Sequence, residues 1–249
     1  MVTASIMKTT PATVPILETG RGWLVVDKPF GLSVHNDPAR DLCSIVSDFI
    51  QNDSFLHKRL QYESEFGVHA PHRLDKHTSG VMIVACRRDV FRYLSGQFEN
   101  HLIRKRYAAL LHGRLTAAES DGQWHEWDRP LSREAGGRRK PQGSGRLIEC
   151  TTRYRLIRND SRTCLVECEP LTGRKHQIRR HACLTGHSVI GDKRYGSQKA
   201  LKFAGQVLGV DRLALHAMAI NFKPMGHDEM IRVNSTGLPD CFRRHPAVA

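Results

Sequence analysis

One segment of the sequence concentrates side chains that can move protons or act as nucleophiles. It spans residues 71–80 (PHRLDKHTSG) and leads into the apolar stretch 80–85 (GVMIVA). Within it, the carboxylate of Asp75 lies between the cations Arg73 and Lys76. Polar residues at the mouth of a core strand are often placed for chemistry. Asp75 is therefore a candidate catalytic carboxylate, and the alternative is a turn residue in a weak surface ion pair.

A second segment, residues 172–181 (TGRKHQIRRH), is strongly basic. It predicts a short helix at about 176–184 whose first amides could bind a phosphate. If Lys175 starts this helix, it shares a face with Arg179 by four-residue spacing. A solvated basic face is the alternative, but Ile178 is apolar in the middle of the run. We therefore expect the helix to pack against the core and to hold Arg179 near that surface.

The histidines and cysteines favour neither a metal site nor a disulfide framework. His69 and His72 are three residues apart and His176 and His181 five apart, without the further ligands of a closed zinc site. The seven cysteines include no C-x-x-C pair, and their number is odd. We expect free thiols and no bound metal.

Apolar runs and their periodicity predict the elements that must position these segments. Many strands with few long helices indicate an α+β fold with a largely antiparallel or mixed sheet. The predicted strands are 23–27, 80–85, 106–111, 151–157, 164–169 and 213–222, and the predicted helices besides 176–184 are 42–55 and 89–100.

Residues 116–145 break this pattern. Glycine pairs and Asp-Arg-Pro predict loops or a protruding excursion, which we place at about 128–147. Its centre carries three consecutive cations, Arg138, Arg139 and Lys140. Because the segment is glycine-rich and lacks apolar periodicity, we expect a mobile basic loop, with a passive surface loop as the alternative.

The charge balance indicates a polyanionic partner. The chain has 38 Lys and Arg against 25 Asp and Glu, a formal net charge of +13. Such an excess attracts nucleic acid, although a generic basic protein is the alternative. No apolar run approaches the roughly 20 residues that span a bilayer, and residues 1–15 lack the apolar stretch of a signal peptide. We therefore expect a cytoplasmic protein that binds nucleic acid and no membrane.

Four blocks, in order, resemble the RluA-type family of RNA pseudouridine synthases, and the likeness runs from about residue 22 to 233. It implies the pseudouridine synthase fold, a central mixed and mainly antiparallel sheet with flanking helices and an active-site cleft. The blocks are 24–35 (LVVDKPFGLSVH), 72–85 (HRLDKHTSGVMIVA), 105–107 (KRY) and 172–196 (TGRKHQIRRHACLTGHSVIGDKRYG), followed by a shorter match at 213–217 (LALHA).

The resemblance also implies an activity, the isomerisation of uridine to pseudouridine in tRNA or rRNA, without a cofactor. It makes Asp75 the catalytic carboxylate, as nucleophile or as base, and pairs it with Arg179. It stacks Tyr107 on the flipped uracil, although from the sequence alone a strand-core aromatic is the simpler interpretation. The further residues that we assign to substrate or RNA binding are Arg73, His72, Ile178, Leu215, Arg174, Lys175, Arg138, Arg139 and Lys140.

These assignments divide the chain into an N-terminal tail (1–17), a catalytic domain (18–238) containing the basic loop, and a C-terminal tail (239–249). Some family members carry an N-terminal S4 RNA-binding domain. Because about twenty residues precede the first block, we expect no such domain here, and we expect a monomer that needs no nucleotide cofactor.

Three alternatives compete with this interpretation. A catalytically weak RNA-binding relative would have lost the Asp or the Arg, but Asp75 and Arg179 are both present. A zinc deaminase requires P-C-x-x-C, which does not occur. A basic protein bound to ribosomes for structural reasons would fail an assay for uridine conversion.

Overall fold

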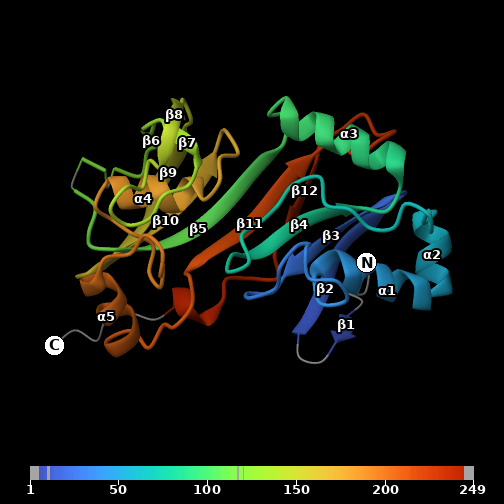
Figure 1. Cartoon of the computed structure of the whole chain (residues 1–249), viewed down its shortest axis with the longest axis horizontal. Coiled ribbons are helices and arrows are strands. Elements are labelled where there is room, and N and C mark those ends of the chain that lie inside the picture. The colour runs from blue at the N-terminus through green and yellow to red at the C-terminus, as the bar shows by residue number, and fades with distance from the viewer. Residues whose placement is uncertain (1–5, 10–11, 117, 120, 244–249) are drawn as a thin grey trace. The chain divides into compact units, whose positions relative to one another are not determined.

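The chain divides into two units, each built from two stretches of sequence. The computed structural model describes residues 6–9, 12–116, 118–119 and 121–243 (Figure 1). The first unit contains Met1–Lys105 and Ala217–Gly237, and the second contains Arg106–His216 and Leu238–Ala249.

Antiparallel strands form the sheet of the first unit. β3 and β4 are buried along their whole length, as their continuous apolar runs predict. β2 pairs with β1 and β3, β3 pairs with β4, and β11 pairs with β12. The strands are β1 (Ile6–Thr9), β2 (Ala12–Gly20), β3 (Trp23–Lys28), β4 (Ser79–Ala85), β11 (Leu215–Phe222), which begins in the second unit, and β12 (Ile231–Asn234).

Three helices accompany this sheet, α1 (Leu42–Asn52), α2 (Ser54–Leu60) and α3 (Arg88–Glu99). α3 packs on β4 (Figure 1), and its Val90 and Leu94 join a core that contains Trp23 and Phe222. The single helix predicted over 42–55 is two helices. Asp53 ends α1, and its side chain accepts a hydrogen bond from the Leu56 amide at 2.9 Å, which caps α2.

The sheet of the second unit is also antiparallel, in the order β5-β10-β9-β6. α4 packs on β9 and β10. The elements are β5 (Arg104–His112), whose first two residues belong to the first unit, β6 (His125–Trp127), β9 (Thr152–Asn159), β10 (Thr163–Pro170), α4 (Gln177–Leu184), α5 (Gln198–Gln206) and the 3-10 helix η1 (Asp240–Phe242). The α+β fold with a mainly antiparallel sheet is as predicted from the sequence.

The excursion expected at 128–147 is not all loop. It contains β7 (Leu131–Glu134) and β8 (Ser144–Ile148), which form a two-stranded antiparallel sheet, called the hairpin below. The sequence conceals both strands because they are short and glycines interrupt them. Gly143, for example, has a φ of 80° and lies where a side chain would run into the carbonyl of Glu134.

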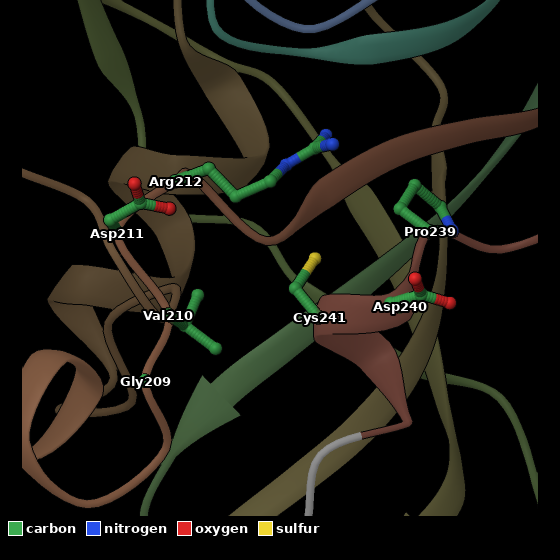
Figure 2. A pocket seen from close by; sticks show the side chains of 7 residues that line it. All are labelled: Gly209, Val210, Asp211, Arg212, Pro239, Asp240 and Cys241. Atoms are coloured by element: carbon green, nitrogen blue, oxygen red, sulfur yellow. The ribbon is translucent and has the colours of Figure 1, made fainter.

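The two expected tails overlap ordered structure. β1 and most of β2 fall within 1–17, and η1 falls within 239–249, with Phe242 buried. Asp240, Cys241 and Arg212 line a pocket of about 410 Å³, and their side chains are drawn in Figure 2. Residues 1–5, 10–11 and 244–249 of these tails lie outside the described residues. Among the described residues, no helix is long and apolar enough to cross a membrane.

Candidate active site

Asp75 lies in the turn that leads into β4, called the Asp75 turn below (residues 71–79). The amide of Thr78 donates to the Asp75 carbonyl at 3.0 Å, which closes the turn one residue before the strand. Asp75 is half-buried, whereas Arg73 is exposed. At the start of β4, Gly80 has a φ of 111°, and a Cβ there would run into the backbone of Ala217 on β11. Only glycine therefore lets the strand begin directly behind the turn.

A buried lysine ties the Asp75 turn to the preceding block of sequence. Lys28 is fully buried, and its Nζ donates to the carbonyls of Pro29 (3.0 Å), Leu32 (2.8 Å) and Lys76 (3.2 Å). The Gly31 amide donates to the same Lys76 carbonyl at 3.0 Å. Burying an ammonium is costly unless it is hydrogen-bonded, and these carbonyls satisfy it. Sequence reasoning missed this role, although a lysine closing an apolar run was a usable signal.

His72 is packed into the first unit as a neutral ring. Its Nε2 accepts a hydrogen bond from the Ile83 amide at 3.0 Å, and the ring stacks on Phe98 with centroids 4.4 Å apart. Burial and the nearby ammonium of Lys105 lower the pKa of His72 to about 3. With Nε2 as an acceptor, the proton of the neutral ring lies on Nδ1. The structure thus gives His72 a packing role, and its assignment to RNA binding stays a prediction.

In the second unit, α4 (Gln177–Leu184) agrees within one residue with the helix predicted at about 176–184. His176 is the N-cap, with left-handed φ and ψ of 55° and 29°, so Lys175 lies outside the helix. Lys175 therefore does not start the helix, and the condition for a helical face shared with Arg179 is not met. The cause is Gln177, whose Oε1 accepts from the Arg174 amide (3.0 Å) and whose Nε2 donates to the Thr151 carbonyl (2.9 Å). These bonds bend the chain just before the helix.

Arg179 is held by a buried carboxylate that sequence reasoning missed. Its Nε donates to Oδ2 of Asp192 at 2.7 Å and its Nη2 to Oδ1 at 2.9 Å. Asp192 is 1% exposed, and Oδ1 also accepts from the amides of Arg194 and Tyr195, both at 3.0 Å. The Arg179 guanidinium lies 5.2 Å from the Tyr195 ring centroid. A two-point ion pair of this kind fixes the plane of the guanidinium.

The neighbouring Arg180 binds the hairpin. It is fully buried, and its Nε donates to the Pro141 carbonyl (2.6 Å), its Nη1 to that of Ser132 (3.1 Å) and its Nη2 to that of Gln142. Arg194 adds bonds to the carbonyls of Ala135 and Gly136, at 2.6 and 2.8 Å. The hairpin is thus fastened to α4 and to the segment after it, unlike the mobile loop expected from the sequence.

The three hairpin cations differ in their surroundings. Arg139 and Lys140 are exposed, whereas Arg138 is half-buried. The Nε of Arg138 is inaccessible to solvent and has no hydrogen-bond partner within the described part of the chain. Its charge is close enough to Cys183 of α4 to influence the pKa of that thiol, which burial raises overall. Arg138 therefore lies toward α4, and the other two cations lie toward solvent.

The remaining predicted residues fall into two groups. Tyr107, Ile178 and Leu215 are buried at 8%, 6% and 4% exposure, which suits the walls of an apolar pocket. Arg174 and Lys175 are exposed, which suits contact with a polyanion. His72, Arg73 and Asp75 belong to the first unit, whereas all other predicted site residues belong to the second. The pairing of Asp75 with Arg179 stays a prediction.

The other histidines of the two pairs have structural partners. His69 Nε2 lies 2.8 Å from the Phe66 carbonyl, His176 Nδ1 lies 2.9 Å from the Tyr195 hydroxyl, and His181 Nδ1 lies 2.9 Å from Thr152 Oγ1. In the part of the chain that the structure describes, no three His, Cys, Asp or Glu side chains are grouped as metal ligands would be. All seven cysteines are free thiols, as expected.

The family model described as RNA pseudouridylate synthase matches residues 22–183 of the chain. The ribosomal large subunit pseudouridine synthase D of Zymomonas mobilis is 37% identical over 80% of the chain and 61% of its own length. The ribosomal large subunit pseudouridine synthase C of Vibrio parahaemolyticus is 31% identical over 85% of the chain and 62% of its own length. The chain thus spans less than two thirds of the length of these curated relatives.

Two solved human structures share the fold. RNA pseudouridylate synthase domain containing 4 aligns with a TM-score of 0.70 and 24% identity, covering 92% of this chain and 90% of that one. RNA pseudouridylate synthase domain containing 1 aligns with a TM-score of 0.67 and 21% identity, covering 99% and 91%. At these identities the likeness establishes the architecture alone.

Proposed function

Because the chain belongs to the RNA pseudouridylate synthase family, we propose that it isomerises uridine to pseudouridine in RNA, with Asp75 as the catalytic carboxylate. The observation that carries the proposal is the Asp75 turn. It places a half-buried carboxylate at the start of β4, and Lys28 fixes the turn by donating a hydrogen bond to the Lys76 carbonyl. The fastened guanidinium of Arg179 is the second part of the proposed site.

The reaction breaks the C–N bond between uracil and ribose, turns the base and joins its carbon to the same sugar carbon. No atom is lost and no electron is transferred overall, so the proposal requires no redox partner. Asp75 acts in one of two ways, by attacking the sugar carbon or by removing a proton from the sugar. Both routes require the ionised carboxylate.

Arg179 would supply the opposite charge. Asp192 binds one edge of its guanidinium, through Nε and Nη2. We propose that another edge meets Asp75, since five N–H donors allow one arginine to serve two carboxylates. A guanidinium already fixed by Asp192 loses little conformational freedom when the substrate binds, which favours the productive geometry.

The target uridine must also leave its stack, which costs a few kcal/mol. Stacking of uracil on Tyr107 would return about 1–3 kcal/mol, and Ile178 and Leu215 would exclude water from the pocket. Arg73, exposed on the Asp75 turn, would fill the space that the base leaves. Arg174, Lys175 and the hairpin cations would bind phosphates.

The substrate that we propose is rRNA or tRNA. The names of the relatives specify ribosomal large subunit pseudouridine synthases, which favours rRNA. No nucleotide cofactor and no membrane enter the proposal, and a cytoplasmic monomer remains our expectation.

The test is to map pseudouridines in the RNA of cells with and without this protein. We expect specific sites to disappear on deletion and to return with the wild-type gene but not with Asp75→Asn. Sites that persist without the protein, together with no conversion of bulk RNA by the purified chain, would leave a non-catalytic RNA-binding relative as the better account.

A further inference from the structure

α5 and the turn between β9 and β10 form a concave basic surface in the second unit, outside the residues assigned to the reaction. It encloses about 390 Å³ and is called the α5 groove below. We propose that the α5 groove binds the phosphodiester backbone of RNA beyond the reacting nucleotide. This inference rests on the proposed function. The lining residues are Arg162, Gln198, Lys199, Lys202, Phe203, Gln206 and Val207.

The charge of the α5 groove is of one sign. Arg162, Lys199 and Lys202 are all exposed, and no carboxylate lines the groove. Within the described part of the chain, no Asp or Glu lies within ion-pair distance of these three cations. By contrast, the nearby Arg158 is paired with Asp160 at 3.1 Å. An uncompensated group of cations attracts polyanions, and its charge is available to neutralise phosphates.

A histidine behind the groove responds to the same positive field. The ring of His112 meets the Phe203 ring edge to face, with centroids 5.4 Å apart. Burial lowers the pKa of His112 most, and the charges of Lys199, Arg162 and His187 lower it further. No carboxylate offsets them. The cations of the groove thus lie close enough to His112 to disfavour its protonated form.

The groove is formed before any ligand binds. The Arg162 guanidinium lies 4.6 Å from the centroid of Phe203, whose side chain is buried. This stacking holds the cation over the groove and distinguishes the surface from a solvated face of freely moving lysines. α5 itself is fixed by Ser197, which accepts a hydrogen bond from the Ala200 amide at 3.1 Å. The amides of Gln198 and Gln206 can bind phosphate or ribose oxygens.

The α5 groove follows closely on the residues around Arg179. Tyr195, whose ring lies beside the Arg179 guanidinium, is two residues before the cap of α5. The Gly196 amide donates to the Asp192 carbonyl at 2.8 Å, so the connection is short and fixed. Lys199 is the fourth residue after Tyr195, so the two lie at most about 14 Å apart along the chain. One RNA strand could therefore reach both places, which favours RNA over other polyanions as the occupant.

The test is a triple variant in which Arg162, Lys199 and Lys202 are replaced by Ala, assayed in the full chain with a stem-loop RNA extended on both sides of the target uridine. Three lost phosphate contacts should reduce the slope of log affinity against log salt by up to about two, at roughly 0.7 per contact on single strands. Affinity at low salt should fall, whereas kcat at saturating RNA should not change, because none of the three residues takes part in the chemistry.

A matched control removes three exposed cations of the first unit, Lys58, Arg59 and Arg92, with the same change in net charge. It should change the slope much less. A second variant, Lys199→Gln with Lys202→Gln, keeps helix-favouring side chains and the stacked Arg162, so it tests the groove without disturbing α5.

The outcomes separate the two proposals. Equal slopes for the groove and control triples would overturn the α5 groove, as would a fall in kcat with unchanged binding. If the wild-type chain converts no uridine but the groove triple still lowers the slope, the proposed function fails and the groove stands. If conversion is normal but an RNA trimmed to the target loop binds as tightly as the long RNA, the groove fails and the function stands.

Discussion

The Asp75 turn and the start of α4 hold their side chains by different means. Behind the Asp75 turn, the buried ammonium of Lys28 is satisfied by three carbonyl oxygens, and neutral His72 accepts from a β4 amide. At the start of α4, Arg179 makes a two-point ion pair with buried Asp192. Its neighbour Arg180 binds carbonyls of the hairpin.

The two kinds of contact hold different parts of the chain in place, backbone segments in one case and a side chain in the other. A buried cation surrounded by carbonyls joins backbone segments that are distant in sequence, as Lys28 joins residues 28–32 to Lys76. It leaves no side chain directed at a substrate. The pair of Arg179 and Asp192 instead fixes the orientation of a side chain that can meet a substrate or a second carboxylate. The two consecutive buried arginines therefore have different roles. Arg180 is structural, whereas Arg179 is proposed to act in the site.

The largest effect is expected from removing the charge of the Asp75 turn. Asp75→Asn keeps the size of the side chain but removes the carboxylate. Conversion of uridine should fall at least about 100-fold, the lower range for a group that transfers protons in the rate-limiting step, while RNA affinity stays near that of the wild type. The measurement is single-turnover conversion beside an RNA-binding titration. Appreciable turnover would show that another residue is catalytic.

The ion pair at α4 gives the next effect. Arg179→Lys keeps the charge but not the fork, so kcat should fall by on the order of 10- to 100-fold. Asp192→Asn should produce a similar fall, because an amide cannot accept from both Nε and Nη2. If Asp192 acts through Arg179, the double variant should be little worse than either single variant.

A purely structural Asp192 would behave differently. Its carboxylate also accepts hydrogen bonds from two backbone amides, so replacing Asp192 lowers the stability of the fold in any case. Additive losses in kcat, together with a shared fall in melting temperature, would show that Asp192 only supports the loop.

A smaller effect concerns the pH dependence of stability. The pKa of His72 is about 3 in the folded chain, below the ordinary value of 6.5. Between these values the unfolded chain binds the proton and the folded chain does not, so stability falls as pH decreases from 6.5 towards 3. The loss is at most about 1.4 kcal/mol per pH unit.

His72→Gln should remove this part of the slope, since the amide oxygen can still accept from the Ile83 amide. Denaturant unfolding at pH 7, 6 and 5 measures it, with His227→Gln, at an exposed position, as the control. Equal slopes in the wild type and His72→Gln would mean that the ring is protonated or mobile in the folded chain.

The sequence predicts the buried elements well, because apolar runs such as 80–85 and 164–169 depend on local pattern alone. It does not predict α5, which is short and contains glycine near its end, or the hairpin, whose strands have four and five residues. The family blocks give Asp75, Arg179 and Tyr107 as site residues. Asp192 and Lys28 lie within the same blocks, but their partners are 13 and 48 residues away, and only the folded chain brings them together.

The last prediction concerns the cations of the hairpin, which Arg180 fastens to α4. Replacing Arg138, Arg139 and Lys140 by Ala should weaken RNA binding at low salt and reduce the salt slope by up to about two, with little change in kcat. The three cations should contribute unequally to the change in salt slope. Arg139 and Lys140 are exposed and should account for about 1.4 of the slope, at roughly 0.7 each.

Arg138→Ala by itself tests whether Arg138 resembles Arg179 or Arg180, because its Nε is buried and its charge influences the Cys183 thiol of α4. If Arg138 is structural like Arg180, its loss should lower stability and leave the salt slope unchanged. If it serves the site like Arg179, kcat should fall while the slope and the melting temperature stay constant. Each lost phosphate contact reduces the number of counterions released on binding and so lowers the salt slope. An unchanged salt slope in the triple variant would therefore show that the exposed hairpin cations do not contact phosphates.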